Sequence, residues 1–163
     1  MEHFKKGLLV GRFQPFHNGH LYLIKKAFTF VDALIIGIGS VNTHDKNNPL
    51  SYEDRETLMR QVITREKLDG KKIHIVPLRD YFNDELWLKH ALATVPLFDV
   101  VIGNNEWTNG IFQKAGYTVI RIPYYKRYIY EGERIRKIME RRGKWESRVP
   151  SYLVPFIQEK MLL

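Results

Sequence analysis

The fold is decided by the stretch Gly-Leu-Leu-Val-Gly-Arg-Phe-Gln-Pro-Phe-His-Asn-Gly-His, residues 7–20. Its apolar run at 7–10 is too short for a helix and ends at a glycine, so it predicts a buried strand. Apolar residues at helical spacing follow from Asn18 or Gly19 onward. A second apolar run at 33–38 completes a strand, a helix and a strand, which is the pattern of a βαβ unit.

The same alternation continues along the rest of the chain. Ser51, with Asp54 three residues later, is close to a capping box and predicts the start of a helix. Strands alternating with helices indicate an α/β protein with a doubly wound parallel five-stranded sheet, and the length predicts a single domain over 1–163. Further strands are predicted at 73–78, 100–102 and 118–122, and further helices at 83–94, 133–142 (with Gly143 as its C-terminal cap) and 151–161.

Composition and charge narrow the class of protein. The net charge of +8 favours anionic partners such as nucleic acid, polyphosphate or an acidic membrane surface, without choosing among them. The absence of cysteine excludes a disulfide scaffold, a thiolate metal site and a cysteine nucleophile. No apolar run approaches the roughly 20 residues that span a bilayer, and the first residues do not form a signal peptide. A soluble, cytoplasmic protein without a membrane partner is therefore expected.

The loop between the first strand and the first helix carries groups suited to phosphate. In such sheets ligands bind beyond the carboxyl ends of the strands, where this loop lies. Gly11 permits a sharp turn, and Gly19 permits close approach to a helix N-terminus, where free N–H groups favour phosphate. His17 and His20 are three residues apart and would both face one side, while Arg12 adds a permanent charge. A metal-binding pair or merely polar surface are the alternative interpretations of the two histidines.

The segment from Gly11 to His20 resembles the His-x-Gly-His signature of the nucleotidyltransferase superfamily. The Arg-Phe-Gln-Pro-Phe run at 12–16 is similar to the archaeal type of nicotinamide mononucleotide (NMN) adenylyltransferase, because cytidylyltransferases and archaeal FMN adenylyltransferases typically have Gly-Thr-Phe-Asp there. The resemblance implies a Rossmann-like nucleotidyltransferase fold that transfers AMP from ATP to NMN, giving NAD and pyrophosphate. It also implies Mg²⁺ carried with ATP, and a homo-oligomer, for which a hexamer is one expected form.

The resemblance assigns roles to individual residues. The catalytic group is His17, His20, Arg12 and Arg136, which would hold the phosphates. The expected ATP-binding residues are Gly11, Phe13, Gln14, Gly19, Gly132, Arg134 and Ile135. The expected NMN-binding residues are Gly37, Gly39, Ser40, Asp80, Asp84, Trp87 and Asn104, with Trp87 stacking on the nicotinamide ring.

Four positions depart from the family pattern. Ile102 stands where the family has Ser before a Gly-Asn pair. At Asp84 the family often has Asn. In the second signature, residues 130–136, the hydroxyl-bearing positions are Glu131 and Glu133. A carboxylate repels phosphate, so these glutamates would point away, help to hold Mg²⁺, stabilise the helix dipole, or accompany a differently seated triphosphate.

Two other functions stay open at this point. One is a transferase of the same superfamily that uses pantetheine phosphate, FMN or a cytidylyl donor. The other is a non-catalytic RNA-binding module, which the basic balance and the altered second signature would suit. The loop signature makes a nucleic-acid partner the less favoured expectation.

Overall fold

A single five-stranded sheet, with all its strands parallel, forms the centre of the computed structural model, which describes residues 2–69 and 71–162. The strand order is β3-β2-β1-β4-β5. The predicted α/β fold with a doubly wound parallel five-stranded sheet is confirmed. The strands are β1 (Phe4–Gly11), β2 (Val31–Ile38), β3 (Lys72–Pro77), β4 (Val100–Gly103) and β5 (Val119–Arg121).

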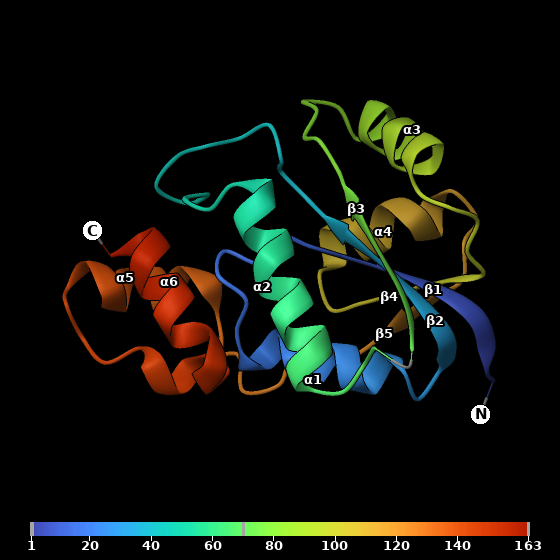
Figure 1. The fold of residues 1–163 in the computed structure, drawn as a ribbon. Coiled ribbons are helices and arrows are strands. Elements are labelled where there is room, and N and C mark those ends of the chain that lie inside the picture. Colours follow the sequence, from blue (N-terminus) through green and yellow to red (C-terminus); the bar gives the residue numbers. More distant parts are fainter. Residues whose placement is uncertain (1, 70, 163) are drawn as a thin grey trace.

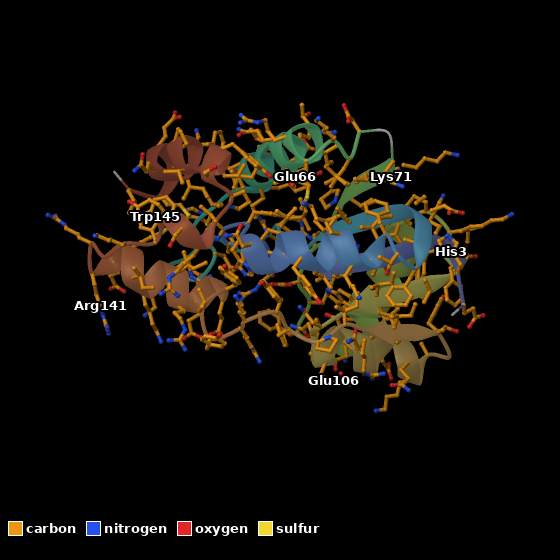
Figure 2. All side chains as sticks on the ribbon, turned by 90° about the horizontal axis from the view of Figure 1, so that it is seen from below. His3, Glu66, Lys71, Glu106, Arg141 and Trp145 are labelled. Carbon is orange, nitrogen blue, oxygen red and sulfur yellow. The ribbon has the colours of Figure 1, made fainter. Side chains whose placement is uncertain are left out.

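Helices cover both faces of this sheet (Figure 1). Successive residues of β1 point to opposite faces, so Leu9 joins a core with α1, α2 and the C-terminal segment, whereas Leu8 joins a core with α3 and α4. Figure 2 places Glu66, at the end of α2, and Glu106, at the start of α4, on opposite sides of the molecule. The helices are α1 (Asn18–Ala27), α2 (Tyr52–Arg65), α3 (Asp84–Thr94), α4 (Glu106–Lys114), α5 (Gly132–Glu140) and α6 (Val154–Met161).

Two local features differ from the expectations. Helix α4 was not predicted; it is short, contains Gly110, and begins where the Asn105 side chain accepts a hydrogen bond from the Thr108 N–H at 3.2 Å. At the end of α5 the left-handed residue is Arg142, with φ of 56°, and not Gly143. The Gly143 N–H still closes the helix by donating to the Ile138 carbonyl at 2.8 Å.

The strand order fixes where a ligand can enter. From β1 the chain proceeds to β2 and β3 on one side, whereas β4 and β5 lie on the other side. The direction of winding therefore reverses between β1 and β4, and the crevice of such a sheet opens at the carboxyl ends of these two strands. Among the helices of the described ranges, none is long and apolar enough to cross a bilayer.

Candidate functional site

A cavity of about 380 Å³ opens at this reversal of the strand order. Strands β1 and β4 pair through Gly7 with Val100 and Leu8 with Val101, and the next residues of β1 line the cavity. One side of the cavity is lined by the loop after β1 and by the starts of α1 and α5. The other side is lined by segments near α3 and α4. The predicted residues that line it are Gly11, Arg12, Phe13, Gln14, His17, Gly19, His20, Gly39, Ser40, Asp80, Trp87, Asn104, Gly132 and Arg136.

The two histidines form the N-terminal cap of α1. His17 Nδ1 accepts hydrogen bonds from the backbone N–H groups of Gly19 at 3.1 Å and His20 at 3.3 Å. His20 Nδ1 in turn accepts from the His17 N–H at 3.1 Å, and the two rings stack with their centroids 3.5 Å apart. A Cβ on Gly19 would lie 2.9 Å from the His17 ring and 3.1 Å from Tyr130 Cβ, so this position needs glycine.

These contacts fix the chemical state of both rings. A neutral imidazole whose Nδ1 accepts a hydrogen bond carries its proton on Nε2. Burial lowers the pKa of His17 to about 3. Burial, followed by the charge of His17, lowers the pKa of His20 well below its ordinary value. Both rings are therefore neutral at pH 7, and each carries an Nε2–H on a residue that lines the cavity.

Permanent positive charge comes from two arginines on facing elements. Arg12 follows β1, and its Nη1 donates to Asn48 Oδ1 at 3.3 Å. Arg136 lies on α5, and its Nη1 donates to the Gln14 carbonyl oxygen at 2.7 Å. Burial and the nearby Arg12 charge lower the pKa of Arg136, yet a guanidinium stays protonated at neutral pH.

The loop after β1 is held by its own buried side chains. Phe13 is buried with φ of 55°, and a Cβ on Gly11 would lie 2.9 Å from its ring. The Gln14 side chain donates to the Leu50 carbonyl at 3.0 Å and accepts from the Leu50 N–H at 2.9 Å. Both ends of that amide are thus engaged, which ties the loop to the segment before α2.

Arg55 is a buried residue beside the cavity that was not singled out from the sequence. It lies on α2 with 1% of its surface exposed. Its Nη1 donates to the carbonyl oxygens of Gly39 at 2.6 Å and Arg12 at 2.9 Å, and its Nε donates to the Ser51 carbonyl at 3.2 Å. Burial, followed by the charge of Arg12, lowers its pKa to about 10, so it remains cationic at neutral pH. One buried charge therefore joins the loops after β1 and β2 beneath the cavity.

The start of α5 brings its two glutamates to the cavity wall. Glu131 lies 3.6 Å from Arg127 Nε, and Glu133 lies 3.0 Å from Lys137 Nζ. The hydrogen bond from Lys137 holds the pKa of Glu133 below its ordinary value. Each carboxylate is thus offset by a cation of its own segment. Gly132 between them gives room for Arg136, since a Cβ would lie 3.1 Å from its Nη1.

The opposite side of the cavity holds the predicted acceptor residues. Asp80 follows β3 and is anchored by Asn42, whose Oδ1 accepts from the Asp80 N–H at 2.8 Å, and by Thr43, whose hydroxyl donates to Asp80 Oδ2 at 3.3 Å. Trp87 is 2% exposed and packs edge-on against Trp107, with ring centroids 5.2 Å apart. Asp80 and Trp87 thus lie on the cavity wall, but most of the Trp87 surface is in the core.

Four predicted residues do not line the cavity. Gly37 gives space to Leu78, because a Cβ would lie 2.6 Å from Leu78 Cδ1. Asp84 and Arg134 are exposed, and the Ile135 side chain is fully buried in the core. Their roles toward a nucleotide stay predictions.

Several aromatic residues of the cavity wall were not predicted from the sequence. Trp107 on α4 is 50% exposed, and its place depends on a helix that the pattern did not reveal. On the segment before α5, Tyr124 stacks beneath Arg127, with Cζ 4.2 Å from the ring centroid. Tyr125 packs against Tyr22 of α1 at 4.4 Å. The density of tyrosines at 124–130 was the one signal available in the sequence.

Comparison with known proteins shows the family to which the chain belongs. Residues 8–138 match the family model described as cytidylyltransferase-like. A nicotinamide-nucleotide adenylyltransferase from Archaeoglobus fulgidus is 37% identical over 158 residues, covering 94% of this chain and 91% of that protein. Its counterpart from Methanocorpusculum labreanum is 40% identical over 158 residues, covering 95% and 91%.

Solved structures share the fold. A bifunctional NMN adenylyltransferase/ADP ribose pyrophosphatase from Francisella tularensis has a TM-score of 0.78 at 22% identity, covering 94% of this chain and 50% of that one. This chain thus spans half of the bifunctional protein. A second structure of that protein, complexed with AMP and a manganese ion, has a TM-score of 0.72 at 23% identity, covering 94% of this chain and 49% of that one. By sequence, the chain belongs to the cytidylyltransferase-like family and, within it, to the archaeal-type nicotinamide-nucleotide adenylyltransferases.

Proposed function

We propose that this chain transfers the AMP portion of ATP to the 5′-phosphate of NMN, giving NAD and pyrophosphate. The observation that carries the proposal is the pair of neutral, stacked imidazoles at the start of α1, in one cavity with Arg12 and Arg136. Relatives named for this activity match more than nine-tenths of the chain, which supports the choice of acceptor.

The chemistry suits residues that position and stabilise charge. The NMN phosphate is already an anion at neutral pH, so it can attack the α-phosphorus of ATP without a strong general base. The bond from the α-phosphorus to the bridging oxygen breaks, and pyrophosphate leaves with that electron pair. Negative charge on the phosphate oxygens meets the Nε2–H donors of His17 and His20 and the guanidinium groups of Arg12 and Arg136. Preorganised donors of this kind act on the transition state with little reorganisation.

Magnesium enters as part of the MgATP substrate. Residues 2–69 and 71–162 contain no group of three or more His, Asp or Glu side chains that could hold a metal ion. Mg²⁺ is commonly held by substrate phosphates and water with one or two carboxylates. Glu131 and Glu133 lie on the cavity wall at the start of α5, where each is already paired with a cation. The AMP and manganese complex of the Francisella protein supports the use of a divalent ion.

An acceptor panel tests the activity. The protein is incubated with MgATP and, in separate reactions, NMN, nicotinic acid mononucleotide, phosphopantetheine or FMN. Pyrophosphate release and the joined product are then measured. Formation of NAD with NMN is the expected result, and release with another acceptor alone would replace the proposal. Tight, salt-dependent RNA binding without pyrophosphate release would favour the non-catalytic alternative.

The variant His20→Ala is the low-activity control for this acceptor panel. Loss of one transition-state donor is expected to reduce turnover by ~10²–10³. Near-wild-type turnover of this variant would contradict the role of His20.

Two further properties stay predictions of the same proposal. The homo-oligomer, including its hexameric form, is tested by light scattering of the purified protein. The cytoplasmic location is tested by fractionation of the source cells.

A further inference from the structure

The exposed side chain of Arg12 is held by a buried amide that has no part in the mechanism so far. Asn48, in the loop between β2 and α2, is 6% exposed, and its Oδ1 accepts from Arg12 Nη1 at 3.3 Å. A long, unrestrained arginine side chain loses rotamer entropy when it binds a ligand, so a contact that restricts it in advance favours binding. Asn48 is therefore placed to orient the Arg12 guanidinium before a nucleotide arrives.

Asp45 determines which end of the Asn48 amide faces Arg12. Asp45 Oδ1 accepts from Asn48 Nδ2 at 3.1 Å and from the Asn48 backbone N–H at 2.9 Å. The hydrogen bond from the Asn48 side chain, followed by that from the Asn47 N–H, lowers the pKa of Asp45, so this carboxylate is charged at neutral pH. A reversed amide would turn its NH₂ group toward the guanidinium and its oxygen toward the carboxylate, and both contacts would be repulsive.

The amide also separates two opposite charges. Arg12 donates to the neutral oxygen of Asn48, and Asp45 binds the other end of the same amide. A carboxylate at position 48 would instead form an ion pair with Arg12 and compete with the triphosphate for its guanidinium. An asparagine thus orients the arginine without giving it an anionic partner.

The same loop also supports the second arginine of the cavity. The Gln14 side chain bonds both the N–H and the carbonyl of Leu50, two residues after Asn48. The Gln14 carbonyl oxygen in turn accepts from Arg136 Nη1 at 2.7 Å. The loop therefore holds Arg12 directly through Asn48 and Arg136 indirectly through Gln14.

We propose that Asn48 is a positioning residue for nucleotide binding, which orients Arg12 toward the triphosphate through an amide held in place by Asp45. The inference rests on the proposed function, since that function assigns Arg12 to the phosphates of MgATP. Asn48 does not line the cavity, so it acts through Arg12 and needs no contact with the nucleotide.

A double-mutant cycle tests whether Asn48 acts through Arg12. Calorimetry measures the dissociation constant of MgATP, without acceptor, for the wild type, Asn48→Ala, Arg12→Ala and the double variant. Pyrophosphate release gives kcat and both KM values for the same proteins. Asn48→Asp has the same size as the wild type and adds the charge that the amide avoids. Asn47→Ala is the matched control, because exposed Asn47 meets Asp45 through its backbone N–H and lies outside the cavity lining.

The expected losses depend on Arg12. Asn48→Ala should weaken MgATP binding about 3- to 10-fold, the range for one orienting hydrogen bond, but less than about 2-fold when Arg12 is already alanine. The KM for MgATP should rise and the KM for NMN should stay unchanged. Asn48→Asp should weaken MgATP binding more than Asn48→Ala does, and more at low salt than at high salt. Asn47→Ala should match the wild type.

Three results would overturn the inference. Equal losses in the two backgrounds would mean that Asn48 supports the fold of the loop and does not act through Arg12. Unchanged MgATP binding in Asn48→Ala would mean that the hydrogen bond does not orient the arginine. Wild-type binding in Asn48→Asp would mean that the neutrality of the amide has no effect. If alanine at this buried position prevents cooperative unfolding in urea, the cycle is run with Asn48→Ser, which is too short to reach Arg12.

Failure of the proposed function gives a different result. MgATP binding is measured without acceptor, so the coupling between Asn48 and Arg12 can be present in a protein that forms no NAD in the acceptor panel. That combination would refute the proposed activity and leave the role of Asn48 in place. NAD formation with no coupling would do the reverse.

Discussion

His17 has two roles, in helix capping and in phosphate binding, and a pair of substitutions can separate them. Its Nδ1 caps α1 by accepting from the N–H groups of Gly19 and His20, and its Nε2–H is the proposed phosphate donor. Asparagine keeps the first role, because its side-chain oxygen is among the best N-caps, and it loses the second, because it has no group at the position of the imidazole Nε2–H. Alanine removes both roles. His17→Asn and His17→Ala should therefore differ in stability and agree in catalysis.

The magnitudes follow from the two kinds of contact. Loss of a helix N-cap costs about 1 kcal/mol of unfolding free energy, so we expect that decrease in His17→Ala and a change below about 0.5 kcal/mol in His17→Asn. Loss of one donor to the transition state lowers turnover by ~10²–10³ in both variants. Unfolding in urea, followed by tryptophan fluorescence, measures the first quantity. Pyrophosphate release at saturating MgATP and NMN measures the second.

A cap outside the cavity provides the control. Asn83 Oδ1 accepts from the Leu86 N–H at 3.1 Å at the start of α3, so Asn83→Ala should lose about 1 kcal/mol of stability with turnover retained. If His17→Asn keeps turnover within about threefold of the wild type, His17 is a cap alone and the phosphate donor lies elsewhere. If it loses as much stability as His17→Ala, the capping geometry itself is refuted.

Three further results are expected from the same structure. Arg55→Met should lower the free energy of unfolding by about 3 kcal/mol, since three carbonyl oxygens around the buried guanidinium lose their donor; urea denaturation measures this, and a loss below about 1 kcal/mol would contradict the bracing role. Acid should destabilise the protein through the two histidines of the cavity, whose pKa values are lowered in the folded state, to about 3 for His17. The unfolded chain binds protons below about pH 6.5 that the folded chain does not, so this stability is complete above that pH and is lost as the pH falls toward 3, by roughly 1.4 kcal/mol per pH unit and ring. The free energy of unfolding in urea, measured at about pH 7 and about pH 5.5, tests this. If its dependence on pH is the same in His17→Asn as in the wild type, the pKa of His17 is not lowered in the folded protein. Glu133→Thr removes a carboxylate from the cavity wall and adds a hydroxyl at the start of α5, so the KM for MgATP should fall about 2- to 5-fold at low salt and less at high salt; an increase would mean that Glu133 helps to bind the metal-nucleotide.

The sequence predicted those parts of the molecule that depend on local pattern. Buried parallel strands are apolar runs, and the run at 33–38 falls within β2 (Val31–Ile38). Caps are short-range signals, and Ser51 accepts from the Asp54 N–H at 3.1 Å as its spacing indicated. The loop from Gly11 to His20 is contiguous, so its residues could be placed together from the sequence alone.

Long-range contacts explain what the sequence could not predict. Arg55 resembles any charged residue of an amphipathic helix, and its burial depends on carbonyl groups that come from loops far away in the chain. Trp107 depends on α4, a short helix with an internal glycine. The surface of Trp87 was predicted to stack on a ligand, but its burial by neighbours from α4 could not be read from a single helix.

The altered second signature is compatible with phosphate binding because of how the cavity distributes its charges. Both histidines are neutral, so attraction for the triphosphate must come from guanidinium groups. Glu131 pairs with Arg127 and Glu133 pairs with Lys137, which neutralises the carboxylates within their own segment. Arg12 and Arg136 instead donate to neutral acceptors, Asn48 and the Gln14 carbonyl, so their hydrogen-bond partners do not offset their charge.

Arg55 adds to the positive charge beneath the cavity. Its partners are backbone carbonyls, which carry no net charge, so its positive charge adds to the field beneath the loop after β1. A buried charge is screened less by salt than an exposed one. We therefore expect the affinity for MgATP to decline with increasing salt less steeply than it would if only exposed cations, such as Lys126 and Arg127, attracted the nucleotide. A slope unchanged in Arg55→Met, in protein that remains folded, would restrict Arg55 to bracing the loops.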